Sequence, residues 1–278
     1  MQIIDFHTHT FEDNVAERAI KKLSASANII SYLGGTDGEL IQSNRNGYCT
    51  SVVLPVATKI SQSDGINSRN YKKNMISMDT GVIYFAAIHP EDSNIKAKLF
   101  AIKSAGFKGI KLHPAFQGLR IDDNNYLKII DIASGLGLIT VIHAGYDISY
   151  PQNENASVRY ILNMVRTLNP ERVVLAHMGG WNQWDMVESD LAGANVYFDT
   201  SFCLNELIPN DRNLPFSNVR LSKEQFLRIV KLHGIDRILF GTDSPWSDKE
   251  ESASIIKNIG LCQSDLDKLF YKNASAIL

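Results

Sequence analysis

Two histidines stand two positions apart near the start of the chain, in the apolar stretch IIDFHTHT at residues 3–10. If residues 3–9 form a β-strand, side chains alternate between its two faces, so Asp5, His7 and His9 share one face. Two imidazoles then occupy one small volume, as two ligands of a metal ion would. Such a pair is also common as hydrogen-bonded polar residues at a strand end, so the remaining ligands must come from other parts of the sequence.

Further polar side chains follow other apolar runs, each at the point where a strand would end. Taken singly, each has a structural explanation, such as a turn cap or an ion pair. Together they place several metal-binding and proton-transferring groups on one rim, because the carboxyl ends of parallel strands meet there. The combination predicts a metal site. Besides His7 and His9, the groups at these positions are Lys111, His113, His143, His177, Asp199 and Asp243.

The elements that would carry these groups alternate between short β-branched runs and stretches with helical spacing. This alternation predicts a parallel sheet, and eight units favour an α/β fold closed into a (β/α)8 TIM barrel, with an open doubly wound sheet as the second choice. The predicted strands are Ile3–His7, Ser51–Pro55, Val82–Ile88, Gly109–Leu112, Leu138–His143, Arg172–His177, Asn195–Asp199 and Arg237–Gly241. The predicted helices include Asn94–Ala105, Tyr126–Gly135, Ser157–Leu168 and Ser222–His233.

No linker or low-complexity tract divides the sequence, so residues 1–278 are predicted to form a single domain. Residues 10–45, 56–74 and 200–221 are interpreted as loops over the mouth of the barrel, where binding residues usually lie. They carry no motif that identifies a substrate.

Bulk properties point to a small-molecule ligand. The chain has a net charge of -2 and no long Lys or Arg run, which gives no electrostatic reason to expect nucleic acid or an acidic membrane as a partner. Its three cysteines contain no CxxC pair and suggest neither a disulfide framework nor a thiolate zinc site. Without a leader-like segment or an apolar run near ~20 residues, the expected location is the cytoplasm. The sequence leaves open whether the protein forms a homo-oligomer.

The segments IIDFHTH, GIKLHPAFQG, VIHAGY, LAHMGGW and LFGTDSPW occur in this order, with KNASAIL at the end. This series resembles the amidohydrolase superfamily, and most closely its amidohydrolase-related branch of metal-dependent TIM-barrel hydrolases and decarboxylases. The resemblance covers nearly the whole chain. It implies a (β/α)8 barrel with a divalent metal ion, usually zinc, at the carboxyl-terminal mouth.

By this resemblance, His7, His9, His143 and Asp243 would hold one metal ion and leave a position for water. Zn²⁺ suits this ligand set best, with Mn²⁺, Fe²⁺ or Co²⁺ as alternatives. The ion would lower the pKa of its water, Asp243 would accept the proton, and His177 would act as a second acid or base. In binuclear members of the superfamily a fourth-strand lysine is carboxylated and bridges two ions, which here would bring Lys111 and His177 into the ligand set. One ion is favoured.

With one ion, Lys111 would remain a cation near the substrate. The other predicted substrate contacts are His113, Arg120, Tyr146, Trp181 and Trp246, while Asp199 is predicted to orient His177 or to hold a loop. The predicted function is hydrolysis of a small-molecule ester, lactone or amide by a metal-activated water. The alternative is a metal-dependent nonoxidative decarboxylase, a lyase acting on a small unsaturated or aromatic carboxylic acid.

Overall fold

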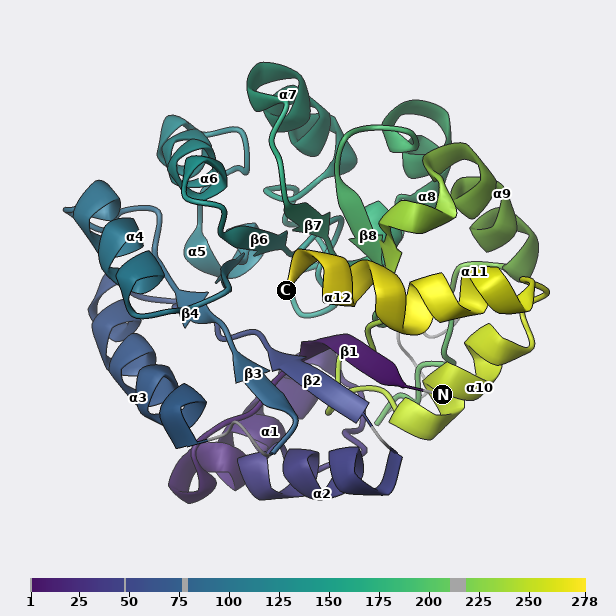
Figure 1. Cartoon of the computed structure of the whole chain (residues 1–278), viewed down its shortest axis with the longest axis horizontal. Helices are drawn as coiled ribbons and strands as arrows, with labels where there is room; N and C mark the ends of the chain where they lie inside the picture. Colours follow the sequence, from purple (N-terminus) through teal and green to yellow (C-terminus); the bar gives the residue numbers. More distant parts are fainter. Residues whose placement is uncertain (1, 48, 77–79, 211–218) are drawn as a thin grey trace.

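A ring of parallel strands forms the centre of the molecule, in a computed structural model that describes residues 2–47, 49–76, 80–210 and 219–278 (Figure 1). All neighbouring strands are parallel and follow one another in chain order, which confirms the predicted (β/α)8 TIM barrel. The strands are β1 (Ile3–Thr8), β2 (Cys49–Val53), β3 (Val82–Tyr84), β4 (Ala86–Ala87), β5 (Gly109–Leu112), β6 (Ile139–Ile142), β7 (Val173–Leu175), β8 (Tyr197–Asp199) and β9 (Ile238–Leu239).

The third predicted strand is interrupted at Phe85, so that β3 pairs with β2 and β4 pairs with β5. The backbone N–H of Phe85 donates to the Val53 carbonyl at 3.0 Å, which joins the two parts of the ring. The ring closes where the ends of the chain meet. There the N–H of Phe6 donates to the Phe240 carbonyl, and the N–H of Asp243 donates to the His7 carbonyl, both at 2.8 Å.

Helices surround the strands (Figure 1). Within the described residues, no helix is long and apolar enough to span a membrane. The helices are α1 (Asp13–Ala27), α2 (Asp37–Gly47), α3 (Ser63–Ile76), α4 (Ile95–Ser104), α5 (Pro114–Gln117), α6 (Asn124–Gly135), α7 (Val158–Leu168), α8 (Trp184–Met186), α9 (Lys223–His233), α10 (Lys249–Lys257), α11 (Gln263–Asp267) and α12 (Asn273–Ile277). Short 3₁₀ or π turns cover Ile60–Gln62, His177–Gly179, Val187–Leu191, Ile235–Arg237 and Lys268–Lys272.

The predicted helices are confirmed, and the Ser222 side chain caps α9 by accepting from the N–H of Gln225 at 3.1 Å. The interpretation of residues 10–45 and 56–74 as loops is wrong, because they contain α1 and most of α2 and α3. Residues 200–210 and 219–221 form no helix or strand. Residues 211–218 lie outside the described residues.

Helix α3 lacks an apolar stripe and is held in a different way. Three of its asparagines, spaced one helical turn apart, bond to the backbone at the break between β3 and β4. Asn67 exchanges two hydrogen bonds with Ala87, Asn70 donates to the Phe85 carbonyl, and the Asn74 amide donates to the Tyr84 carbonyl. Amide side chains therefore satisfy backbone groups that the interrupted strand leaves unpaired.

Apolar side chains fill the interior of the barrel below its mouth. Branched and aromatic residues of the strands and of the break between β3 and β4 pack there, including Phe6, Val52, Phe85, Val141 and Leu239. Helix α12 contributes to this cluster, and Figure 1 shows it lying across the ring of strands. A larger cluster packs the outer face of the strands against the surrounding helices. With its interior filled, the barrel is left with its carboxyl-terminal mouth as the place for a site.

Candidate metal centre and active site

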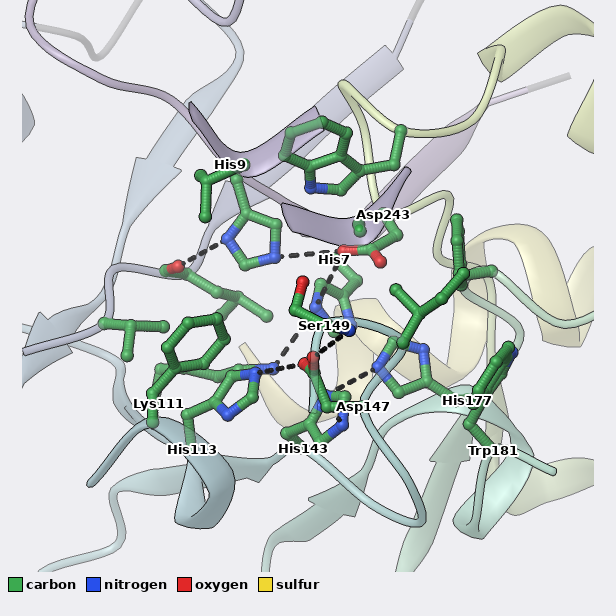
Figure 2. A pocket seen from close by; sticks show the side chains of 18 of the residues that line it. His7, His9, Lys111, His113, His143, Asp147, Ser149, His177, Trp181 and Asp243 are labelled. Atoms are coloured by element: carbon green, nitrogen blue, oxygen red, sulfur yellow. Dashed lines mark hydrogen bonds and ion pairs between the residues drawn. The ribbon is translucent and has the colours of Figure 1, made fainter. Parts of the chain in front are cut away.

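A pocket of about 220 Å³ opens at the carboxyl ends of the strands. Its floor is made by the histidine, lysine and aspartate side chains that the strands and the turns after them present (Figure 2). These are His7, His9, Lys111, His113, His143, Asp147, His177 and Asp243. The structure thus gathers the predicted metal-binding and acid–base residues into one cavity.

His7, His9 and Asp243 bring their ligand atoms together. The Nε2 atoms of His9 and His7 lie 3.0 Å and 3.4 Å from Oδ1 of Asp243. The opposite ring nitrogens are already used: Nδ1 of His7 donates to Asp199 at 2.9 Å, and Nδ1 of His9 donates to the Leu54 carbonyl at 2.8 Å. With Nδ1 carrying the proton, each Nε2 lone pair points toward Asp243, as a metal ligand requires.

The protonation states also suit a divalent ion. Burial, reinforced by the nearby Lys111 ammonium, lowers the pKa of His7 to about 4. Burial alone would raise the pKa of Asp243, but the surrounding histidines hold that pKa well below its usual range. At neutral pH the site therefore offers a neutral His7 imidazole and an ionised Asp243 carboxylate, the forms that bind zinc and similar ions.

Lys111 lies fully buried beside this cluster, with Nζ 3.2 Å from Nε2 of His7. Burial lowers the pKa of Lys111 to about 8, against the opposing effect of Asp199 and Asp243. At pH 7 most molecules carry the ammonium form, and a minority carry a free amine, which is the form that can react with carbon dioxide. The position of Lys111 is compatible with a charged ammonium group and with a carboxylated side chain.

His143, the fourth predicted ligand, faces a second group of side chains. Its Nδ1 lies 3.1 Å from Nε2 of His177, and its Nε2 lies 3.2 Å from the Tyr146 carbonyl and 3.8 Å from Asp147. Joining an ion at the first cluster would mean giving up the contact with His177.

Asp147 was not predicted from the sequence. It follows β6 on a loop, and its Oδ2 lies 3.5 Å from Nε2 of His113. Burial raises the pKa of Asp147 to about 6. His113, His143 and Asp147 could also hold an ion. However, the two imidazoles are stacked 4.1 Å apart at 14°, so their in-plane lone pairs run nearly parallel instead of converging at a tetrahedral angle.

Asp199 connects the two halves of the floor. Its Oδ2 accepts from the His7 ring, while its Oδ1 accepts from the backbone N–H groups of His177 and Ser201 at 3.0 and 3.1 Å. The Ser201 hydroxyl, also unpredicted, lies 3.0 Å from Nδ1 of both His7 and His177. Asp199 therefore orients the ring of His7, and it fixes His177 through the backbone.

Unusual backbone conformations place several of these groups. His177 and Asp243 have φ angles of 59° and 66°, a region that non-glycine residues seldom adopt and that is concentrated at functional sites. Gly145 has φ 87°, and a Cβ there would lie 2.2 Å from the backbone nitrogen of Trp181. This close approach holds the Tyr146–Asp147 turn against the loop that carries Trp181.

Three of the predicted substrate contacts, Tyr146, Trp181 and Trp246, line the pocket together with Lys111 and His113. Arg120 does not. Its guanidinium is half exposed, donates to both Asp122 oxygens, and stacks 4.2 Å from the Tyr160 ring. Arg120 follows the short helix α5, whose Phe116 lines the pocket, but Arg120 itself does not. Arg120 is therefore removed from the candidate site.

Comparison with solved structures places this fold among related barrels. An uncharacterised TIM-barrel protein of Bordetella bronchiseptica is 14% identical with a TM-score of 0.75, covering 100% of this chain and 98% of its own. A dihydroxybenzoic acid decarboxylase of Polaromonas sp. JS666, with bound manganese and the inhibitor 2-nitroresorcinol, is 14% identical (TM-score 0.68, coverage 99% and 96%). A probable 2-pyrone-4,6-dicarboxylic acid hydrolase of Acinetobacter baumannii, with citric acid bound, is 14% identical (TM-score 0.66, coverage 100% and 99%).

No curated protein sequence gives a significant match to this chain. At these identities the structural neighbours show the fold alone, and both a decarboxylase and a hydrolase are among them. A sequence profile decides the family, because the profile of the amidohydrolase family Amidohydro_2 matches residues 64–278, which is more than half of the chain. The chain therefore belongs to the Amidohydro_2 family of amidohydrolases.

Proposed function

We propose that this protein is a metal-dependent hydrolase of a small-molecule ester, lactone or amide, with one divalent ion held by His7, His9 and Asp243 and completed by His143. The convergence of two Nε2 lone pairs on Oδ1 of Asp243 supports this proposal most directly. Zn²⁺ is the first choice for such a set, followed by Mn²⁺, Fe²⁺ and Co²⁺. A bound ion would supply Lewis acidity, which acidifies water and polarises a carbonyl group.

The side chains around this position can move the protons of a hydrolysis. Asp243 is ionised and can accept a proton from water through its carboxylate. His177 has Nδ1 bonded to the Ser201 carbonyl at 3.0 Å and Nε2 3.1 Å from Nδ1 of His143, so Nε2 can exchange a proton with a substrate once His143 turns to the ion. The Lys111 ammonium can pair with a carboxylate or ring oxygen of the substrate.

The proposal leaves two alternatives open, one in the number of metal ions and one in the reaction. If Lys111 is carboxylated, it and His177 would hold a second ion, and the metal content would rise to two per chain. The alternative reaction is nonoxidative decarboxylation of an aromatic or unsaturated acid. The decarboxylase among the structural neighbours favours this alternative, as does the buried Lys111, which could neutralise a carboxylate. A cytoplasmic location and a small-molecule substrate, with no nucleic acid or membrane partner, complete the proposed function.

Metal analysis and a substrate panel test the proposal together. The purified protein, supplied with zinc, is expected to carry about one ion per chain, and the His9→Ala variant is expected to lose it. The matched control is His89→Ala, which removes a histidine at a buried position that does not line the pocket. Less than half an equivalent of any divalent ion in the wild-type protein would overturn the metal site.

The reaction class is tested on the metal-loaded protein with lactones, esters and N-acyl compounds, set beside hydroxybenzoates. Hydrolysis of one of the first group, abolished by His9→Ala, is the expected result. Release of carbon dioxide from the acids, with no hydrolysis in the other arm, would reject the hydrolase and favour the decarboxylase.

A further inference from the structure

The pocket above the polar floor is mainly apolar, and the hydroxyl residues Thr10, Thr58 and Ser149 also line it. Its walls come from helices and loops around the mouth, including α1, α5 and the turns that follow β1, β2 and β6. We call this surface the apolar wall; it consists of Phe11, Leu23, Ile29, Val56, Phe116 and Ile148. A molecule bound between the floor and the apolar wall therefore has a polar end at the strand ends and an apolar environment around the rest of its body.

Charges in the pocket are distributed just as unevenly. Among the described residues that line it, Lys111 is the only lysine or arginine, and it lies on the floor beside His7. Two carboxylates, Asp147 and Asp243, line the same cavity. Arg120, the nearest sequence candidate for a second anion-binding group, is held outside by Asp122 and Tyr160. Among the described residues, a negative charge on the far end of a ligand would thus meet no lysine or arginine and would lose its hydration.

The volume of the pocket limits the size of the ligand. Cavities of roughly 150 Å³ in proteins are large enough to receive benzene. A pocket of about 220 Å³ therefore accommodates one ring with small substituents, and it is smaller than the sites that hold drug-sized ligands.

We infer that the substrate is a molecule of about one ring, with a single anionic or carbonyl group directed at the floor and an uncharged, mainly apolar body against the apolar wall. This inference rests on the proposed function for the orientation of the reacting group. It separates this chain from relatives named for a dicarboxylic acid, such as the probable 2-pyrone-4,6-dicarboxylic acid hydrolase. The absence of a second cation from the described residues of the apolar wall sets the specificity for a substrate with a single anionic group.

Two acids of nearly the same shape test the inference. 3-Methylbenzoate and isophthalate differ by a methyl group in place of the second carboxylate, and calorimetry or competition with a fluorescent ligand would measure their dissociation constants on zinc-loaded protein. We expect 3-methylbenzoate to bind at least tenfold more tightly. Equal binding, tighter binding of isophthalate, or no binding of either acid to the loaded protein would overturn the inference.

A charge placed on the apolar wall provides the reciprocal test. Leu23 lies partly exposed on α1 and lines the pocket. Leu23→Arg is expected to strengthen isophthalate binding at least tenfold, while the uncharged control Leu23→Met keeps the wild-type preference. Ile148→Lys, on the opposite loop, repeats the test if the α1 variant does not fold. An unchanged preference in folded charged variants would contradict the inference.

The metal titration distinguishes a failure of the proposed function from a failure of the inference about the apolar wall. If the protein binds no divalent ion, the proposed function fails. The preference between the two acids is then measured on the metal-free protein, where Lys111 still provides a cation at the floor, and the inference about the apolar wall stands or falls on that result.

Discussion

Replacing Asp199 by asparagine should weaken metal binding although Asp199 is itself no ligand. In the wild-type protein, Oδ2 of Asp199 accepts from Nδ1 of His7 at 2.9 Å, and both side chains are buried. This bond keeps the His7 proton on Nδ1 and leaves the Nε2 lone pair for the ion. The other oxygen, Oδ1, accepts from His177 and from the backbone and hydroxyl of Ser201.

Three donors on Oδ1 fix the amide oxygen of the Asp199→Asn variant at that position, so its NH₂ group would face His7. Two N–H groups cannot share one bond, and His7 must move its proton to Nε2 or turn away. Either change removes a ligand lone pair. Loss of such a partner of a metal-binding histidine lowers metal affinity by roughly 10–100-fold, equivalent to about 1.4–2.7 kcal/mol.

The assay is a zinc titration against a chromophoric chelator at pH 7.5, with thermal unfolding followed on the same samples. Asp92→Asn is the matched control, because Asp92 is a buried carboxylate that accepts from the His89 backbone and from Lys98 away from the pocket. Unchanged zinc affinity in a folded Asp199→Asn protein would refute the reasoning. An equal loss of zinc affinity in Asp92→Asn would show that removal of any buried carboxylate charge weakens zinc binding.

Three further predictions concern other residues. His177→Ala should retain about one metal ion per chain by elemental analysis while kcat falls by roughly 10²–10⁴-fold, since an acid–base group is lost; retained turnover would exclude that role. Arg120→Ala should leave kcat/KM within about twofold, because Arg120 pairs with Asp122 outside the pocket; a large rise in KM would return it to the site. Burial lowers the pKa of His233 to about 4, so the unfolded chain takes up a proton below pH 6.5 before the folded one does. Stability should therefore fall as pH drops from 6.5 to 4, and chemical denaturation of His233→Gln should show a slope smaller by about 1.4 kcal/mol per pH unit; an unchanged slope would contradict this cause.

The barrel was predictable because its strands are short apolar runs that alternate with helical segments, and most of these runs are followed closely by a polar residue. That pattern led to His7, His9, Asp243 and the other floor residues, because each stands at or shortly after the carboxyl end of a strand. It could not lead to Asp147 or Ser201, because both stand in turns whose backbone conformation decides where the side chain points. Arg120 was misplaced because the sequence does not show that its guanidinium pairs with Asp122 and stacks on the Tyr160 ring.

Helices α1 and α3 were not predicted from the sequence, for two different reasons. Helix α1 buries Ala16, Ile20 and Ala27, so its helical spacing is present in the sequence and was overlooked. Helix α3 has no such spacing, because its contacts to the sheet are made by asparagine amides that bond to main-chain groups. A polar segment of this kind is indistinguishable from a loop until the broken strand beside it is known.

The seam of the barrel has a consequence for the order of events during synthesis. His7 and His9 leave the ribosome long before Asp243, which follows the last strand of the barrel. Because the Asp243 N–H bonds to the His7 carbonyl across that seam, the cluster of His7, His9 and Asp243 cannot assemble on a nascent chain that stops before β9. Acquisition of an ion there would thus follow synthesis of β9, and premature termination upstream of β9 would yield chains unable to retain it.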